Sequence, residues 1–444
     1  MGYRSERNYS KSCVEYSENE VLIDAPRNEE FTEVRVKGLG IVSATLFIIG
    51  EMAGSGVLAL PRALVNTGNI GIVLLIVFCL NAAYGGIRLG NCWNMVEQRF
   101  PEHRKATRNP YAIVAEKAIG KFGSHVVSIC IRITLFGAGT VYLLLASQII
   151  QELLRAVVPE LSTCLYFLLI SILITPVLWL SSPKDFSLVG VGAVLTIVCS
   201  CILFNIQIFS DAKTIPTAPR QVHGFHDFFI SSGMILFSFG GASTFPTIQN
   251  DMKNRKDFSM SVAIAFIIIM LLYFPITIGG FLVYGEGVNI NLTLSMTKNL
   301  MVDLGNILIA IHLIFAFLIV LNPVFQDVEE SFQLPKRFHW KRCVFRSLVM
   351  VFVIFVGESV PQFGKILALI GGSTITMTTF VFPPLFYMKL CDQENPNWPK
   401  KVIPLHERVY IWELIVIGLI GGCASTYSAI ISIFGAYSFT RPCY

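Results

Sequence analysis

Small residues interrupt two strongly apolar stretches of this sequence. Residues 48–61 read IIGEMAGSGVLALP, with Glu51 just before the Gly-Ser-Gly interruption, and residues 237–246 read FSFGGASTFP. Inside a bilayer an unpaired backbone N–H or C=O group costs several kcal/mol, so a broken helix persists there only beside a cavity or a ligand. Two breaks in corresponding halves of a chain are the best sequence indication of a secondary transporter's binding site. The pattern predicts that the chain moves a polar molecule across a membrane.

Three ionisable side chains lie inside long apolar segments: Glu51, Arg132 and His312. Such a side chain costs on the order of 3 kcal/mol or more at the bilayer centre, which usually reflects a function. Because a helix rises about 1.5 Å per residue, we expect Glu51 and Arg132 at similar depths near the midplane. With His312 they could form a proton relay in which Glu51 takes up the proton. The alternatives are a structural Glu51–Arg132 ion pair and a buried His312 with satisfied hydrogen bonds.

The composition excludes an ordinary soluble protein. Of 444 residues, 54% are hydrophobic and only 14% are charged. About eleven apolar segments are each long enough to cross a membrane. They cover residues 39–60, 70–96, 124–151, 163–181, 186–209, 228–248, 259–284, 300–322, 343–360, 364–390 and 409–434. We therefore predict an all-α polytopic membrane protein with one transmembrane domain over residues 38–436.

Basic residues set the predicted orientation. Most Lys and Arg residues fall in loops that a cytosolic N-terminus would place in the cytosol, including residues 253–256 and 336–342. Residues 1–37 then form a cytosolic tail, expected to be disordered because it is polar and charged. Residues 437–444 form a short extracellular or luminal C-terminus. The net charge of +5 is explained by these loops, so we expect no nucleic-acid partner.

Two short motifs predict sorting and modification. Glu18, followed by Leu22 and Ile23, resembles an acidic dileucine signal that adaptor proteins read on cytosolic tails, with chance occurrence as the alternative. Asn291 begins an Asn-Leu-Thr sequon in a loop predicted to lie outside, so we expect a glycan there. The 11 cysteines show no metal-ligand spacing, and no metal is expected.

Four sequence motifs carry a resemblance to a known family. They are GEMAGSGVLALPRAL at residues 50–64, FSFGGASTFPTIQNDMKNRKDF at 237–258, NLTLS at 291–295 and FPPLFYMKL at 382–390. Together they resemble the amino acid/auxin permease family, a branch of the amino acid–polyamine–organocation superfamily, over residues 37–434. The resemblance implies a LeuT-type bundle of two inverted five-helix repeats plus one peripheral helix. It also implies amino acid transport driven by H⁺ or Na⁺.

This resemblance assigns a substrate to the two breaks. A half-helix N-terminus offers unpaired N–H groups and a positive dipole end to a carboxylate, while unwound carbonyls can bind an ammonium group. Close helix–helix contact between small residues is the alternative interpretation of either motif alone. The expected substrate-binding residues are Ala53, Gly54, Ser55, Gly56, Thr140, Tyr142, Phe237, Ser238, Phe239, Gly241, Ser243 and Thr244.

The resemblance also implies where a sodium ion or a disulfide would lie. Sodium symporters of this type use hydroxyls in the eighth helix, but residues 313–321 contain no Ser or Thr. Hard cations need oxygen ligands, so H⁺ coupling or no coupling is favoured, unless Asn322 or Asp327 contributes. Cys164 could form half of an outer disulfide, but residues 210–227 contain no cysteine, so we expect no bridge unless Cys443 supplies it.

We expect an H⁺-coupled, alternating-access symporter of small neutral amino acids, in the plasma membrane or an endolysosomal membrane. The substrate is expected to be neutral because Glu51 is assigned to the proton. One alternative is a Na⁺-coupled symporter, and the other is a sensor that binds an amino acid and signals through its tail. No HExxH, GxSxG or similar catalytic constellation is present, so we expect neither an enzyme nor a cofactor other than the coupling ion.

Overall fold

The computed structural model describes residues 38–104, 107, 109–180, 186–214, 223–333, 339–399 and 401–435. The predicted sorting signal at Glu18, Leu22 and Ile23, and both predicted tails, lie outside the described residues. Within the described ranges the chain is almost entirely helical, and the one strand-like feature is an isolated parallel bridge between Leu39 and Met252. The all-α prediction is confirmed.

The helices follow the apolar segments of the sequence closely. They are α1 (Ile41–Met52), α2 (Ser55–Thr67), α3 (Asn69–Arg99), α4 (Pro110–Ile119), α5 (Lys121–Leu154), α6 (Thr163–Leu180), α7 (Phe186–Asp211), α8 (Phe225–Ser238), α9 (Phe245–Asn250), α10 (Phe258–Tyr284), α11 (Leu300–Ser331), α12 (Trp340–Ser359), α13 (Phe363–Ile370), α14 (Phe382–Cys391) and α15 (Leu405–Phe434). A π-helix, η6 (Gly371–Val381), joins α13 to α14.

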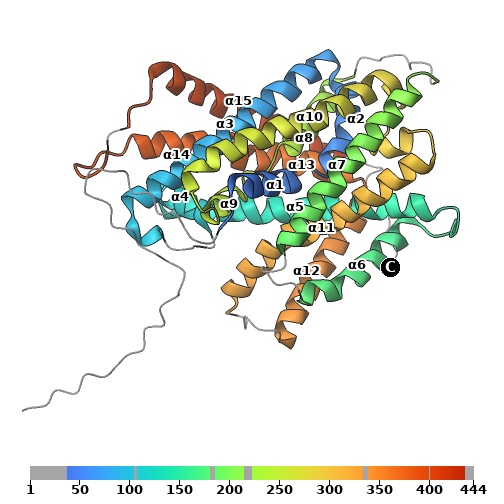
Figure 1. Ribbon diagram of the computed structural model, residues 1–444, viewed down its shortest axis with the longest axis horizontal. Coiled ribbons are helices and arrows are strands. Elements are labelled where there is room, and N and C mark those ends of the chain that lie inside the picture. The colour runs from blue at the N-terminus through green and yellow to red at the C-terminus, as the bar shows by residue number, and fades with distance from the viewer. Residues whose placement is uncertain are drawn as a thin grey trace, which may run out of the picture.

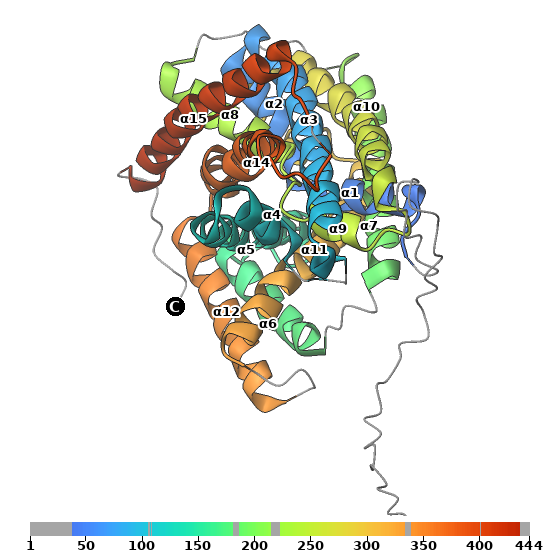
Figure 2. The ribbon, with the colours of Figure 1, turned by 90° about the vertical axis from the view of Figure 1, so that its left-hand side faces the viewer.

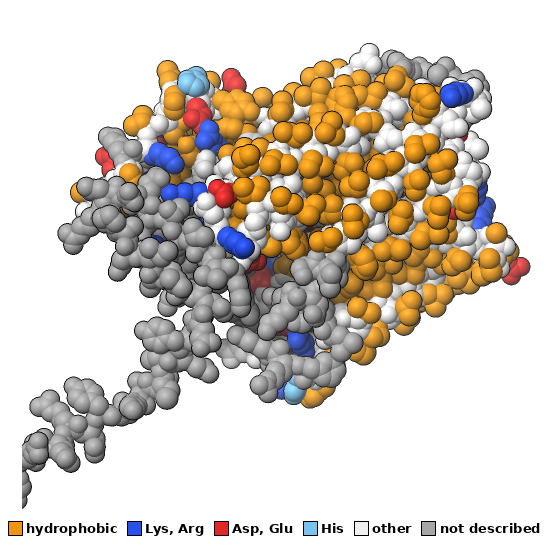
Figure 3. All heavy atoms as spheres, viewed as in Figure 1, with side chains coloured by type: hydrophobic (Ala, Val, Ile, Leu, Met, Phe, Trp, Pro, Cys, Tyr) orange, Lys and Arg blue, Asp and Glu red, His pale blue; other side chains and the backbone are white. Residues whose placement is uncertain are grey.

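Long apolar helices make this chain a multi-pass membrane protein. By length and hydropathy, seven helical spans among the described residues could cross a membrane, and the bent α1–α2 pair would add another. Large apolar side chains are exposed along these spans, among them Leu195 (61%) and Leu271 (69%), and also along the shorter apolar helix α6, at Leu173 (76%). Figure 3 shows such side chains covering most of one face, with charged side chains gathered toward its ends. This distribution suits contact with lipid. The count of about eleven spans and the cytosolic N-terminus stay predictions.

Both predicted breaks are present. The axes of α1 and α2 differ by 55°, and the break between them falls at Ala53 and Gly54. The second break separates the end of α8 at Ser238 from the start of α9 at Phe245. Glycine has a low helix propensity, and Pro246 suits the first turn of α9, where no intrahelical N–H bond is needed. Local sequence therefore accounts for both interruptions.

The helices pack in two groups around the breaks. Helices α1, α2, α3, α8 and α10 pack against one another, whereas α5 packs against α6, α11 and α12. Helix α7 contacts both groups, through α10 and α1 on one side and α11 on the other. Figures 1 and 2 show α6 and α12 side by side at one edge of the bundle, away from the α1–α2 break. The breaks therefore lie where the first group faces α5 and α11.

Candidate functional site

The two broken helices are in direct contact. A Cβ atom added to Gly56 would lie 2.5 Å from Ser238 Oγ, and one added to Gly241 would lie 2.5 Å from Met52 Cγ. Only glycine permits so close an approach, because any other side chain would overlap its neighbour. These two glycines therefore allow close helix–helix contact, which was the alternative interpretation of the two small-residue motifs. That packing also holds the two breaks side by side, as a shared binding site requires.

Two tyrosines hold the backbone at the end of α1. Tyr273 Oη, from α10, donates a hydrogen bond of 2.8 Å to the carbonyl of Met52, and Tyr142 Oη, from α5, donates one of 3.3 Å to the carbonyl of Glu51. Tyr142 was among the expected residues, whereas Tyr273 was missed. The sequence feature that could have identified Tyr273 is its hydroxyl group within the apolar segment 259–284, since a buried tyrosine usually needs a hydrogen-bond partner.

His312 lies against the first break. It is fully buried, and its Nδ1 lies 2.7 Å from the carbonyl oxygen of Ala193 in α7. A carbonyl can only accept, so Nδ1 carries the hydrogen, and the neutral ring then presents Nε2 as an acceptor. Nε2 faces the break, because a Cβ atom on Gly54 would lie 3.5 Å from it. The same Cβ atom would lie 3.4 Å from Cε1 of the Tyr142 ring.

Glu51 separates two cavities. The larger one, called the vestibule below, has a volume of about 770 Å³. Its walls come from α1, α4, α5, α7, α9 and α11 and from the segments before α1, α4 and α9. They include Leu39, Glu51, Asn109, Tyr111, Ser128, Ser243, Thr244, Asn250, Asn322 and Asp327. The vestibule leads from the breaks to the end of the molecule that the sequence places in the cytosol.

The smaller cavity, called the inner pocket, lies between the breaks. It has a volume of about 20 Å³, roughly the space of one water molecule. Glu51, Leu135, Ser243 and Val320 border both cavities. The walls of the inner pocket alone are Met52, Thr134, Ala138, Tyr142, Phe237, Gly240, Gly241 and Ile375. Glu51 is the one carboxylate in this wall, and the other wall residues are uncharged.

The side chain of Glu51 connects the two breaks. Its carboxylate accepts a hydrogen bond from the hydroxyl of Thr244, which immediately precedes α9. Arg132 instead forms an ion pair with Asp327 of α11, and Asp327 borders the vestibule. The alternative of a Glu51–Arg132 ion pair is therefore not found. Glu51 is paired with Thr244, and Arg132 is paired with Asp327. Nothing in the sequence distinguished Asp327 as the partner of Arg132.

Several expected site residues lie outside the two cavities. Thr140 is fully buried and donates its hydroxyl to the carbonyl of Phe136, 2.9 Å away in its own helix. Ser238 likewise donates to Met234 O at 2.9 Å, and Phe239 packs against the ring of Tyr273. Ala53, Gly54 and Ser55 are buried at the first break. These residues shape the site, and their contact with a substrate stays a prediction.

Asn291 is only 1% exposed. Its Oδ1 accepts hydrogen bonds from the backbone N–H and the hydroxyl of Thr293, at 3.2 and 3.0 Å. The sequon residues thus form a buried turn with no room for a glycan, which argues against the expected glycosylation.

Cys164 is disulfide-bonded to a partner outside the described residues. A bridge was expected at this cysteine only if Cys443 supplied it, and Cys443 lies outside the described residues.

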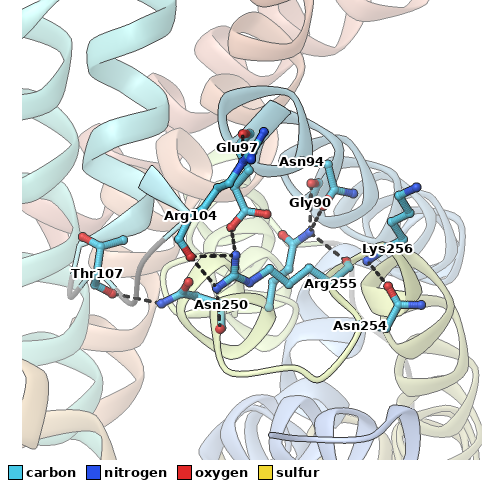
Figure 4. A network of polar contacts seen from close by, with 10 residues as sticks. Gly90, Asn94, Glu97, Arg104, Thr107, Asn250, Asn254, Arg255 and Lys256 are labelled. Atoms are coloured by element: carbon cyan, nitrogen blue, oxygen red, sulfur yellow. Dashed lines mark hydrogen bonds and ion pairs between the residues drawn. The ribbon is translucent and has the colours of Figure 1, made fainter. Parts of the chain in front are cut away.

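A polar network fixes α9 at the mouth of the vestibule (Figure 4). Arg255 forms an ion pair with Glu97 at the end of α3 and donates to the carbonyl of Arg104 at 3.3 Å. Gln249 donates to Gly90 O and Asn94 Oδ1, both at 3.0 Å. Beside this network, Leu39 pairs with the 251–253 segment through backbone hydrogen bonds of 2.8 and 2.9 Å. The start of α1 and the end of α9 are thereby held together.

The opposite end of the site is joined by a different set of contacts. Arg62 of α2 donates to the carbonyls of Glu286 and Val288, at 3.0 and 3.3 Å. His223 Nε2 lies 3.0 Å from the carboxylate of Glu286. These contacts tie α2 to the segments before α8 and after α10, so the structure combines an accessible vestibule at one end with joined helices at the other.

Known proteins share both the sequence pattern and the fold. The family described as "Transmembrane amino acid transporter protein" matches residues 37–431. Amino acid transporter AVT1D of Arabidopsis thaliana is 24% identical over 391 residues, covering 85% of this chain and 67% of the relative. Amino acid transporter AVT3B of the same plant is 24% identical over 432 residues, covering 93% of this chain and 99% of the relative.

Among solved structures, MhsT in complex with L-phenylalanine matches with a TM-score of 0.56 and 13% identity, over 88% of this chain and 99% of that chain. MhsT has the LeuT fold, so the predicted LeuT-type fold class is confirmed, while the number of membrane-spanning helices stays a prediction. The family and the relatives are transporters, which confirms the expectation that the chain is not an enzyme. The resemblance found in the sequence motifs is confirmed over most of the chain, and the protein belongs to the transmembrane amino acid transporter family.

Proposed function

We propose that this protein is a secondary active transporter that carries small neutral amino acids by alternating access and couples their movement to H⁺. The observation that carries the proposal is the position of Glu51, which borders both the inner pocket and the vestibule and hydrogen-bonds to the second break. A titratable carboxylate at the boundary between substrate and access path can link the two. Membership of an amino acid transporter family supports the substrate class.

The substrate's backbone would bind at the two breaks. The N-terminus of α2, at Ser55 and Gly56, supplies N–H groups and the positive dipole end for the carboxylate. We assign the ammonium to the end of α8, where Phe237 borders the inner pocket. There the carbonyl of Phe237 accepts one hydrogen bond, from Gly240 N at 2.9 Å, and keeps a second lone pair. The complex of MhsT with L-phenylalanine supports an amino acid as the class of substrate.

The size and charge of the inner pocket support a small neutral side chain. The pocket is narrow, and its walls beyond Glu51 are apolar, hydroxyl-bearing or glycine. We assign Glu51 to the coupling proton rather than to a cationic substrate. A charged substrate side chain would then lie in the pocket without an opposite charge, which is costly in a low-dielectric site.

Proton uptake by Glu51 would ease closure of the vestibule. Closing requires α1 and α9 to approach α5 and α11, which removes water from Glu51. Burying an ionised carboxylate without a cation is strongly unfavourable, whereas a protonated carboxyl can be buried at much lower cost. In this scheme, binding of a proton and a substrate together permits the change of access, and neither alone is sufficient.

The surroundings of α11 favour H⁺ over Na⁺. The α11 side chain that faces the first break is the imidazole of His312, which is not an oxygen ligand. Of the two alternative ligands, Asp327 is ion-paired to Arg132, and Asn322 would supply a single amide oxygen. Sodium prefers several oxygen ligands, so this arrangement supports a proton as the coupling ion.

Uptake into proteoliposomes tests the proposal. Radiolabelled neutral amino acids are offered with an inward pH gradient or an inward Na⁺ gradient, to wild type, Glu51→Gln and the control Glu160→Gln, an exposed residue outside both cavities. We expect accumulation on the pH gradient in wild type and in the control, and only exchange in Glu51→Gln. Accumulation on Na⁺ alone would refute proton coupling. Binding without any transport would favour an amino acid sensor.

A further inference from the structure

The segment that follows α13 is a π-helix rather than an α-helix. It covers η6 (Gly371–Val381), and the hydroxyl of Thr376 donates to the carbonyl of Gly371, five residues earlier, at 2.8 Å. A π-helix is rare and frequently marks a functional site, because it widens the helix and changes which side chains share a face. This segment reaches the site from outside the two broken helices.

Two hydrogen bonds fix the rotation of this segment. Thr134 of α5 donates its hydroxyl to the hydroxyl of Thr374 at 2.7 Å, and Tyr111 of α4 donates to the carbonyl of Thr378 at 2.5 Å. These contacts lie on either side of Ile375 in the sequence. The direction of the Ile375 side chain is therefore set by neighbouring helices as well as by its own backbone.

Ile375 packs against the backbone of the second break. It is 2% exposed and forms part of the inner-pocket wall. A Cβ atom on Gly240 would lie 2.6 Å from Ile375 Cδ1 and 2.7 Å from Cγ2. The isoleucine thus occupies the space directly beside the residues assigned to bind the substrate's ammonium group.

Besides Met52, which packs on Gly241 of the second break, Ile375 is the large side chain left to limit space at the deep end of the pocket. Leu135 and Val320 also border the vestibule, so they lie toward the access path. Ala138 is already small, and Tyr142 is held by its hydrogen bond to Glu51 O. Phe237 is confined by η6, since a Cβ atom on Gly371 would lie 2.9 Å from Phe237 Cβ.

We propose that Ile375 sets the upper limit on the size of the amino acid side chain that the transporter accepts. The inference rests on the proposed function, in which the substrate's backbone binds at the two breaks. The substrate side chain then points away from the vestibule, toward Thr134, Ala138 and Ile375. Because the pocket holds only about 20 Å³ in this conformation, each added methylene must displace a wall atom.

The test compares leucine with alanine uptake in proteoliposomes for wild type, Ile375→Ala and the matched control Ile370→Ala. Ile370 is also a buried isoleucine packed on a glycine, since a Cβ atom on Gly137 would lie 2.5 Å from its Cγ1, but it borders neither cavity. One methylene in an apolar pocket changes specificity by about tenfold or more. We expect the leucine-to-alanine ratio of kcat/KM to rise at least about tenfold in Ile375→Ala and to stay within about twofold in the control.

A second variant keeps the test valid if Ile375→Ala does not fold. Ile375→Val removes one methylene group and should shift the ratio in the same direction by a smaller factor. Equal ratios in wild type and the Ile375 variants would overturn the assignment of Ile375 while leaving amino acid transport intact. A wild-type protein that takes up no amino acid would overturn the proposed function, and the specificity assignment with it.

Discussion

Glu51 and Thr244 join the two broken helices through a hydrogen bond between the carboxylate and the hydroxyl. The two residues are 193 positions apart, and both border the vestibule. Glu51 lies in the last turn of α1, and Thr244 immediately precedes α9. A change in the charge of this carboxylate therefore acts on both breaks at once, which is the structural basis for the proposed coupling.

Replacing Thr244 by valine should weaken this link. A hydrogen bond to a charged group contributes about 1.5–3 kcal/mol, so we expect Thr244→Val to reduce pH-driven uptake about tenfold or more. Thr244→Ser, which keeps the hydroxyl, should retain most of the activity. The control Thr196→Val removes a hydroxyl that donates only within α7, to Gly192 O and Ala193 O. Wild-type uptake in Thr244→Val would show that the link has no role in coupling.

Gly56 should not tolerate a side chain. A Cβ atom there would lie 2.5 Å from Ser238 Oγ, 2.8 Å from Ser238 Cβ and 2.9 Å from its Cα. Overpacking of this kind costs about 1–3 kcal/mol. We expect Gly56→Ala to lower the melting temperature of the purified protein and to abolish uptake. Because the Cβ and Cα clashes remain, Ser238→Ala should not restore it.

Gly40→Ala is the matched control for this prediction. A Cβ atom on Gly40 meets nothing within 4 Å, and the residue already has an extended backbone conformation. Its melting temperature and uptake should equal those of wild type. Equal behaviour of the two alanine variants would mean that the breaks do not pack as tightly as the structure shows.

Arg132 provides a test of the proton relay. Its ion pair with Asp327 is partly exposed, with 42% of the Arg132 side chain accessible, and such pairs contribute about 1 kcal/mol or less. We expect Arg132→Gln to lower stability slightly and to retain accumulation on a pH gradient. Loss of pH-driven accumulation with exchange intact, as expected for Glu51→Gln, would return Arg132 to the relay.

The breaks could be predicted from the sequence because their signals are local. Glycine and serine within an apolar segment interrupt a helix wherever the segment lies, and Pro246 marks the restart of the second helix. The motifs also carried enough family pattern to indicate the LeuT-type bundle. Hydropathy in turn located the segments that became helices.

The side-chain partners could not be predicted in the same way. Asp327 meets Arg132 across 195 residues, and no local pattern records that pairing. The sequence of η6, GGSTITMTTFV, reads as an ordinary apolar span with small residues, so neither its π-helical form nor the position of Ile375 was visible. Asn291 matched a sequon, but its burial depends on how the loop packs. Tertiary contacts decide all three.

Asn291 should act as a structural residue. Its Oδ1 accepts from two groups of Thr293, and losing a buried acceptor leaves donors unsatisfied at a cost of about 1–3 kcal/mol. We expect Asn291→Ala to lower the melting temperature. Treatment of the wild-type protein with an endoglycosidase should not change its mobility on a gel through this site. A mobility shift that Asn291→Gln removes would contradict the structural assignment.

His312 can be tested with two substitutions that each keep one ring position. An asparagine amide can replace the Nδ1–H group that donates to Ala193 O, but it leaves no group at Nε2. A glutamine amide can reach the Nε2 position and loses the bond to Ala193. We expect His312→Asn to fold with nearly wild-type stability and to lose at least about tenfold in uptake, with a changed pH profile. His312→Gln should be destabilised by about 1–3 kcal/mol, because the Ala193 carbonyl loses its partner. If His312→Asn instead transports at the wild-type rate with an unchanged pH profile, the imidazole serves only to hold α11 against α7.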